Sequence, residues 1–226
     1  MPERRPSATV ETICERIWLA IAERRLRPGA RLKEEQLAEI FEVSRARIRQ
    51  AFAMLERDGL IILVPHRGAC VAEPTITEAR DVFFARRAIE GRVLDRLCAS
   101  IDAAGIARLR AHVAAERAAH AANDRSAIVR LSGAFHLLIA ELSGAQYLQQ
   151  VLRDLVSRTS LITAVYQPQM VASCGPDEHA AIVEAIAAGC ATQAMAHMAA
   201  HLDHVEREID LQGAAEPPRD LRDALL

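Results

Sequence analysis

Three histidines in the C-terminal half of the chain are spaced so that they could meet at one metal ion. His136, His179 and His201 each fall in a different predicted helix. Three imidazoles from three helices can bind a borderline divalent metal such as zinc, and they leave a coordination position open for water or a ligand. The sequence alone keeps a second interpretation open, because a histidine on an apolar helix face is more often a hydrogen-bonded core residue.

The helices that would carry these histidines follow a linker at residues 72–75. Beyond the linker the strand signals stop, and apolar side chains recur with the period of a helix. We expect residues 75–213 to form an all-α six-helix bundle, and residues 214–226 to form a flexible tail. The predicted helices cover residues 78–100, 103–121, 125–143, 146–165, 177–189 and 192–211.

Residues 1–74 have a different pattern and predict a winged helix-turn-helix domain, so the whole chain is expected to be mostly α. Pro28-Gly29 predicts a turn before a short helix at residues 33–41, and Ser44 is a good N-cap for the next helix. A hairpin follows, with strands at residues 60–64 and 69–72 and a turn at residues 66–68. The apolar stripe of the second helix consists of Ile48, Ala51, Phe52 and Leu55.

The second helix of this domain begins with arginines on the faces away from its apolar stripe. Arg45, Arg47 and Arg49 would give it an uncovered positive N-terminus, which the major groove of duplex DNA can accept. The alternative is a solvated basic helix in an ordinary α-domain. The basic hairpin tip that follows favours DNA contact, and the predicted contact residues are Lys33, Glu34, Ser44, Arg45, Ala46, Arg47, Arg49, Gln50, His66, Arg67 and Gly68.

The charge distribution agrees with a DNA-binding N-terminal part. The net charge of the 226-residue chain is -2, which excludes a uniformly basic nucleic-acid binder. Residues 1–74 nevertheless carry a net +2 and the remainder a net -4. Within residues 44–70 there are five arginines and only two acidic residues. Positive charge is therefore concentrated on the predicted second helix and hairpin.

Cysteine usage and hydropathy indicate a cytoplasmic protein. The five cysteines are scattered, and no Cys-x-x-Cys pair occurs, so we expect them to be reduced. The N-terminal segment has charge but no apolar core of a signal peptide. No run of about 18 apolar residues is present, so no membrane span is expected.

The N-terminal motifs resemble those of the GntR family of bacterial transcription regulators. The family pattern of Pro-Gly, Leu, Glu-x-x-Leu-Ala, Val-Ser-Arg-x-x-x-Arg, Leu-x-x-x-Gly-Leu and Arg-Gly-x-x-Val occurs here in order. Two positions depart from it: Ala46-Arg47 replaces the usual Thr-Pro, and Gln50-Ala51-Phe52 replaces Glu-Ala-Leu. The motifs are carried by Pro28-Gly29, Leu32, Glu34 to Ala38, Val43 to Arg49, Leu55 to Leu60 and Arg67 to Val71.

Residues 77–211 resemble the FCD effector-binding domain that accompanies this winged helix in the FadR subfamily. Many members bind a metal through three histidines and an Asp one turn before the first of them. Here Ser132 stands at the place of that Asp, so the resemblance implies a three-histidine zinc site at His136, His179 and His201. The matching motifs are Arg86 to Glu90, Phe135-His136, Glu178 to Ile182 and Met198 to Leu202.

The resemblance also implies a small-molecule effector, commonly a small carboxylate that reaches the metal. Arg86 and Arg158 could each form a fork on a carboxylate, although either could instead form a salt bridge, such as Arg86 with Glu90. Hydroxyls along the fourth bundle helix would add polar contacts. The predicted effector-binding residues are Arg86, Ser132, Arg158, Thr159, Thr163 and Tyr166.

The expected function is that of a ligand-responsive transcription regulator, not an enzyme. In the family a homodimer commonly holds two winged domains over a palindromic operator and represses until a metabolite binds. A zinc-responsive sensor is the first alternative. A metal-dependent hydrolase is the second, and it is disfavoured because Glu178, the one carboxylate near the site, lies about 100° around its helix from His179.

Overall fold

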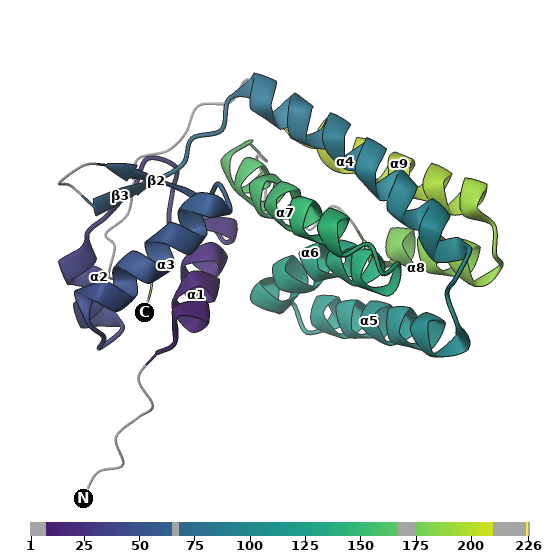
Figure 1. The fold of residues 1–226 in the computed structure, drawn as a ribbon, viewed down its shortest axis with the longest axis horizontal. Coiled ribbons are helices and arrows are strands. Elements are labelled where there is room, and N and C mark those ends of the chain that lie inside the picture. The colour runs from purple at the N-terminus through teal and green to yellow at the C-terminus, as the bar shows by residue number, and fades with distance from the viewer. Residues whose placement is uncertain (1–7, 65–67, 167–174, 210–224, 226) are drawn as a thin grey trace, which may run out of the picture.

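The computed structural model describes residues 8–64, 68–166, 175–209 and 225. Figure 1 shows a small N-terminal domain with a short sheet and, beside it, a larger bundle of long helices. The chain passes from the first part to the second just before the long helix at the top of the view. The predicted class, a winged helix-turn-helix followed by a helical bundle, is confirmed.

The N-terminal domain combines three helices with a three-stranded antiparallel sheet of order β1-β3-β2. The sequence predicted only the two hairpin strands. The third strand pairs Arg31 with Cys70 and Leu32 with Ala69, and it is too short for a period-2 pattern to reveal. The elements are α1 (Val10–Ala22), β1 (Arg31–Leu32), α2 (Glu34–Ile40), α3 (Arg45–Arg57), β2 (Ile61–Val64) and β3 (Gly68–Val71).

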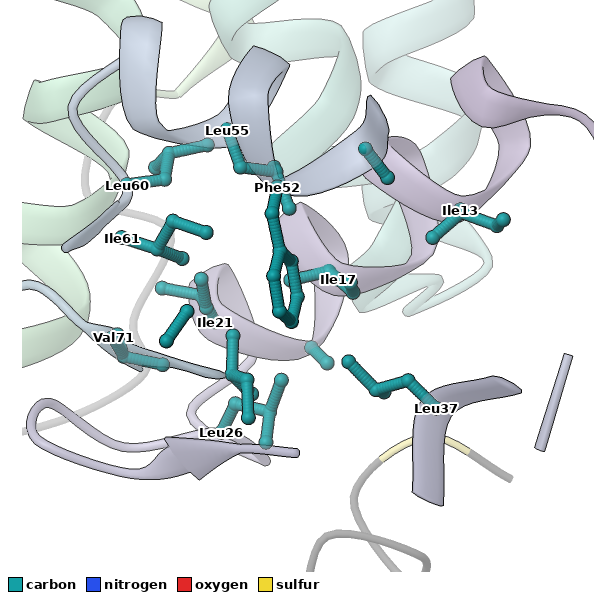
Figure 2. Close-up of a cluster of buried hydrophobic side chains, with 14 of the residues drawn as sticks. Ile13, Ile17, Ile21, Leu26, Leu37, Phe52, Leu55, Leu60, Ile61 and Val71 are labelled. Atoms are coloured by element: carbon teal, nitrogen blue, oxygen red, sulfur yellow. The ribbon is translucent and has the colours of Figure 1, made fainter. Parts of the chain in front are cut away.

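The core of this domain forms where α1, α3 and the sheet converge, as Figure 2 shows. The predicted apolar stripe of α3 is buried, with Phe52 at its centre. Two residues from far along the chain join this core, Leu161 and Leu225, each 2% exposed. The expected flexible tail therefore does not hold at Leu225, whose carbonyl also accepts a hydrogen bond from Arg16. The rest of that tail lies outside the described residues.

The bundle has the six predicted helices, with ends that differ by only a few residues. Its first helix starts at a capping box in which Thr75 and Glu78 each bond the other's backbone N–H. Among the described residues, none of the helices is both long and apolar enough to cross a membrane. The helices are α4 (Ile76–Cys98), α5 (Ala103–Ala121), α6 (Arg125–Leu142), α7 (Gln146–Tyr166), α8 (Pro176–Ala187) and α9 (Ala191–Arg207).

Helix α7 belongs to both parts of the molecule. Its first turns lie in the bundle, where Leu152 is fully buried. Its last turns run beside α1, and there Leu161 enters the core of the N-terminal domain. In addition, the guanidinium of Arg24 donates to the carbonyl of Thr163 at 3.1 Å. The position of the N-terminal domain therefore depends on α7.

Truncating Leu161 tests this dependence. Leu161→Ala removes a buried side chain and should lower the free energy of unfolding by about 2–5 kcal/mol, because a cavity is left where two domains meet. Urea titration followed by circular dichroism measures the change. A loss below 1 kcal/mol would mean that the N-terminal domain does not rest on α7; Ser157→Ala, on the same helix, serves as the control.

Candidate functional site

The three predicted histidines meet in the middle of the bundle. His136 lies on α6, His179 on α8 and His201 on α9, and none is more than 3% exposed. One ring nitrogen from each lies within 4.8 Å of the others. Phe135 stacks on the ring of His179 with 3.9 Å between centroids. The prediction that these three imidazoles converge is confirmed, and the group is called the histidine cluster below.

Each member of the histidine cluster is hydrogen-bonded through Nδ1 to a glutamate from another helix. With Nδ1–H donating to a carboxylate, Nε2 is the nitrogen left as a ligand atom. This bracing is typical of metal-binding histidines, because it fixes both the tautomer and the ring orientation. The pairs are Glu90 with His136 at 2.5 Å, Glu116 with His179 at 2.9 Å, and Glu178 with His201 at 2.8 Å.

The unsatisfied atoms of the site allow a test of whether a metal fits. Among the described residues, the Nε2 of His179 is buried and has no hydrogen-bond partner. A buried nitrogen lone pair without a partner costs free energy, and binding an ion would remove that cost. Three neutral imidazoles suit zinc better than harder cations, which prefer oxygen ligands. The donor set therefore fits a zinc ion.

Burial keeps two members of the histidine cluster, His136 and His201, in the neutral form that binds metal. Burial lowers the pKa of His136 to about 3, and the nearby Arg86 charge acts in the same direction. Burial also lowers the pKa of His201, although the hydrogen bond that His201 donates to Glu178 acts in the opposite direction. Burial alone would raise the pKa of Glu90, but Arg86 and His136 outweigh it and lower that pKa to about 2. At neutral pH the site therefore holds one guanidinium, ionised glutamates and the uncharged imidazoles of His136 and His201.

Arg86 is the cation of the site. It is 3% exposed, and its Nε donates to Oε1 of Glu90 at 2.7 Å. Its Nη1 donates to the Thr159 hydroxyl at 3.2 Å. Its Nη2 is buried and has no hydrogen-bond partner among the described residues. The predicted salt bridge with Glu90 is therefore present, but it is internal, and it leaves one N–H group of the fork for a further acceptor.

The other predicted effector residues are placed differently. Arg158 pairs with Asp154 at 3.1 Å and lies against Gly59 at the end of α3. Because Arg158 lies one residue before Thr159, it points about 100° around α7 and away from the histidine cluster. Ser132 lies one turn before His136 on α6 and is half-buried.

Thr163 and Tyr166 also lie outside the histidine cluster. The hydroxyl of Thr163 donates to the carbonyl of Ser160, and that of Tyr166 donates to the carbonyl of Pro74 at 2.6 Å. The predicted hydroxyls along α7 are present, but those of Thr163 and Tyr166 bond to backbone carbonyls. Of the predicted hydroxyls, only that of Thr159 contacts the buried arginine.

Two carboxylates of the site were missed or misjudged from the sequence. Glu116 lies in an alanine-rich helix 63 residues before its partner, and no local pattern marks it. Glu178 does lie away from His179, as its helical position predicts, but it accepts hydrogen bonds from His201 and His204 on α9. His204, near the end of α9, is therefore part of the outer hydrogen-bond network.

The predicted DNA-contact residues mostly lie on one exposed surface. Ser44 caps α3 by accepting from the backbone N–H of Arg47, as predicted. Ser44, Arg45, Ala46, Arg49 and Gln50 are exposed, as is Lys33 on the neighbouring helix. A groove of about 1140 Å³ separates α3 from the wing. Its lining includes Arg31, Lys33, Glu34, Arg45, Arg49 and Gly68.

Besides Glu34, four of the predicted DNA contacts are not among these exposed residues. Arg47 is half-buried and its Nη1 donates to the carbonyl of Ala8 at 3.1 Å, so part of its fork is held against the start of α1. Gly68 is half-buried at the start of β3. His66 and Arg67, at the tip of the wing, lie outside the described residues.

Comparison with known proteins identifies both parts of the chain. Residues 9–71 match the family model "Bacterial regulatory proteins, gntR family", and residues 81–204 match the model "FCD domain". The chain belongs to the GntR family and carries an FCD domain. It is therefore a transcription regulator and not an enzyme, and its two domains imply DNA binding and response to a small molecule.

Curated relatives of this GntR-family chain are also named as HTH-type transcriptional regulators or repressors. "Uncharacterized HTH-type transcriptional regulator YdhC" of Bacillus subtilis is 28% identical over 79% of this chain and 80% of its own length. "HTH-type transcriptional repressor RspR" of Escherichia coli is 29% identical over 57% and 56%. "HTH-type transcriptional regulator LutR" of Bacillus subtilis is 27% identical over 80% and 92%.

Solved structures of the family share the fold. The Escherichia coli protein McbR/YncC aligns with a TM-score of 0.73 at 19% identity, over 86% of this chain and 92% of its own. A GntR regulator from Rhodococcus sp. RHA1 aligns with a TM-score of 0.75 at 24% identity, over 92% and 99%. At these identities the likeness establishes the architecture of this GntR-family chain and nothing finer.

Zinc titration tests the histidine cluster. The full-length protein should bind one zinc ion, and His179→Ala should abolish this because two imidazoles make a weak site. Glu116→Gln should weaken zinc binding about 10–100-fold, because an outer partner that orients a ligand is lost. Competition with a chromophoric chelator measures both. His120→Ala, outside the cluster, is the control; full zinc loading of His179→Ala would exclude this site.

The depressed pKa of His136 predicts acid lability of the metal-free protein. In the unfolded chain a histidine titrates near 6.5, whereas His136 in the folded chain titrates at about 3. Between these values the unfolded state binds the extra proton, so the free energy of unfolding should fall as pH drops from 6.5. Urea midpoints at several pH values measure this. The free energy of unfolding of His136→Gln should fall less over the same pH interval. An equal fall would contradict the assignment of this pH dependence to His136.

Proposed function

We propose that this chain is a metabolite-responsive repressor, which binds a palindromic operator as a homodimer and is controlled by a small anion at a zinc-containing pocket. The observation that carries the proposal is a pair of buried polar atoms without partners, Nε2 of His179 and Nη2 of Arg86. The Nε2 of His179 would bind a metal ion, and the Nη2 of Arg86 would donate a hydrogen bond to an anion. Together they favour a ligand that touches both.

The metal of the pocket is zinc in this proposal. His136, His179 and His201 would hold it through Nε2, with their Nδ1–H groups on glutamates. A bound ion would supply positive charge and one open coordination position for the effector. Ser132, in place of the carboxylate found in many relatives, leaves the site one negative charge poorer, which favours an anionic effector.

The effector is a small carboxylate. The Arg86 guanidinium already has one N–H on Glu90 and one on Thr159, so a carboxylate oxygen would complete its fork. Burial of all these groups restricts the size of the effector and strengthens its charge-assisted hydrogen bonds. Arg158, Thr163 and Tyr166 are not assigned to the pocket, because their contacts lie elsewhere.

Helix α7 is the route from pocket to operator. Thr159 contacts Arg86, and only two residues further on Leu161 lies in the core of the winged domain. An effector that draws Arg86 away from Thr159 would change how α7 holds α1. A coupling free energy of about 1–3 kcal/mol would alter operator affinity about 5–150-fold.

The operator arrangement follows from the docking geometry of such domains. Two winged domains in a dimer would place α3 in successive major grooves about one helical turn apart, which requires a palindrome. The relative named as the repressor RspR supports repression as the direction of control. Relief of repression by the effector completes the proposal.

Arg86→Gln tests the proposal. An operator is first selected from random duplexes with the wild-type protein, and its affinity is then measured with zinc and a panel of small mono-, di- and tricarboxylates. The wild-type protein should release the operator with at least one of them. Arg86→Gln should bind the operator but respond about 10-fold less, because the charged donor to the effector is lost.

Arg92→Gln, exposed on the same helix, is the matched control and should respond as the wild type does. Release by zinc alone, with no carboxylate effect, would replace the proposal with a zinc sensor. An unchanged response in Arg86→Gln would remove Arg86 from the effector site.

A further inference from the structure

A carboxylate lies between two arginines at the start of α3. The Nε of Arg49 donates to both oxygens of Glu34, at 2.9 and 3.1 Å. The Nη2 of Arg45 donates to the same carboxylate at 3.2 Å. The Glu34 side chain is only 19% exposed, whereas those of Arg45 and Arg49 are 51% and 62% exposed. Glu34 therefore sits beneath the two arginines. The Nη1 of Arg45 donates to Glu35 at 2.8 Å, whereas Arg49 remains open to a ligand.

The local fold fixes this arrangement. Glu34 is the first residue of α2 and Arg45 the first residue of α3, so the starts of two helices meet here. A carboxylate is favoured at a helix N-terminus by the helix dipole. The hydrogen bond from Arg49 is the main reason that the pKa of Glu34 is lowered, so the carboxylate is ionised at neutral pH.

The ion pair with Glu34 leaves the two terminal nitrogens of Arg49 available to a ligand. A guanidinium has five N–H donors, and within the described residues Arg49 contacts Glu34 through Nε alone. Its two terminal nitrogens remain for an outside acceptor. A fork of this kind matches the N7 and O6 acceptors of guanine in the major groove. Glu34 therefore anchors the arginine at its base and leaves its tip for contact.

The same carboxylate has the opposite effect on phosphate. Arg31, Lys33, Arg45 and Arg49 line the groove between α3 and the wing, together with two carboxylates, the partly buried Glu34 and the exposed Glu35. A phosphate that enters the groove is attracted by the cations but repelled by Glu34. A guanine edge carries no net charge and is not repelled in this way. The carboxylate should therefore weaken binding to any duplex while sparing base contacts.

We infer that Glu34 is a specificity-determining residue, which lowers affinity for bulk DNA and holds Arg49 for base recognition. This inference rests on the proposed binding of DNA by α3. It assigns to Glu34 a role through the arginines, rather than a direct contact with a base. Discrimination between operator and bulk DNA would then depend on a residue that weakens general binding.

Glu34→Gln is compared with Glu39→Gln in the full-length protein. Glu39 is exposed on the same helix, and its substitution makes the same change of charge. Fluorescence anisotropy measures binding to the selected operator and to a shuffled duplex of equal composition. Glu34→Gln should bind the shuffled duplex about fivefold more tightly than Glu39→Gln, the effect of one unit charge a few ångströms away in water. Operator affinity should rise less, so the ratio of the two affinities should fall.

Two further readouts separate this role from a structural one. The dependence of shuffled-duplex binding on salt should steepen by about 0.9 in Glu34→Gln, as expected for one more phosphate contact. In an Arg49→Ala background the effect of Glu34→Gln should shrink, because the released arginine is absent. Zinc binding equal to that of the wild type shows that the variant is folded.

Equal affinity ratios for Glu34→Gln and Glu39→Gln would overturn the inference. So would a loss confined to the operator with unchanged shuffled-duplex binding, because that result means that Glu34 contacts a base itself, for example a cytosine amino group. If the wild-type protein selects no operator, the proposed function fails and the inference falls with it. If the wild-type protein prefers an operator but Glu34→Gln leaves the ratio of operator to shuffled-duplex affinity unchanged relative to Glu39→Gln, only the inference about Glu34 is overturned and the proposed function stands.

Discussion

The buried carboxylate of Glu90 is the contact on which the rest of the site depends. It joins the guanidinium of Arg86 to the imidazole of His136, and all three side chains are at most 3% exposed. A buried charge is costly unless it is paired and fully hydrogen-bonded. Because Glu90 uses both oxygens, it fixes the tautomer of His136 on one side and the direction of Arg86 on the other. Glu90 thereby holds the histidine cluster and the Arg86 guanidinium next to each other.

The consequences reach the DNA-binding domain through Arg86. Its remaining bond to Thr159 places the charged pair against α7, and the same helix supplies Leu161 to the core of the winged domain. In a close-packed interior such a helix shifts as a unit, since its neighbours leave no space for local bending. In the mechanism we propose, the position of the winged domain and the occupancy of the effector pocket both depend on this one helix.

Periodicity predicted α2, α3, the bundle helices and the buried stripe of α3, because each of these depends on neighbours within a few residues. The three-histidine site was expected mainly from the resemblance to the FCD domain. Periodicity did not predict Glu116, whose partner is 63 residues away. It placed Thr163 with Thr159 because both lie on one side of the helix, although only Thr159 contacts Arg86 and the Thr163 hydroxyl bonds to the Ser160 carbonyl. The paired strand β1 and the buried Leu225 were missed for the same reason: their partners are distant in the sequence.

Linkage between the two sites tests the coupling most directly. Titration calorimetry gives the affinity of the zinc-loaded protein for the tightest-binding carboxylate, with and without saturating operator duplex. Binding equilibria are reciprocal. The operator must therefore lower the affinity for the carboxylate by the same factor as the carboxylate lowers the affinity for the operator, about 5–150-fold. A carboxylate affinity that is identical with and without the operator would contradict a route through α7.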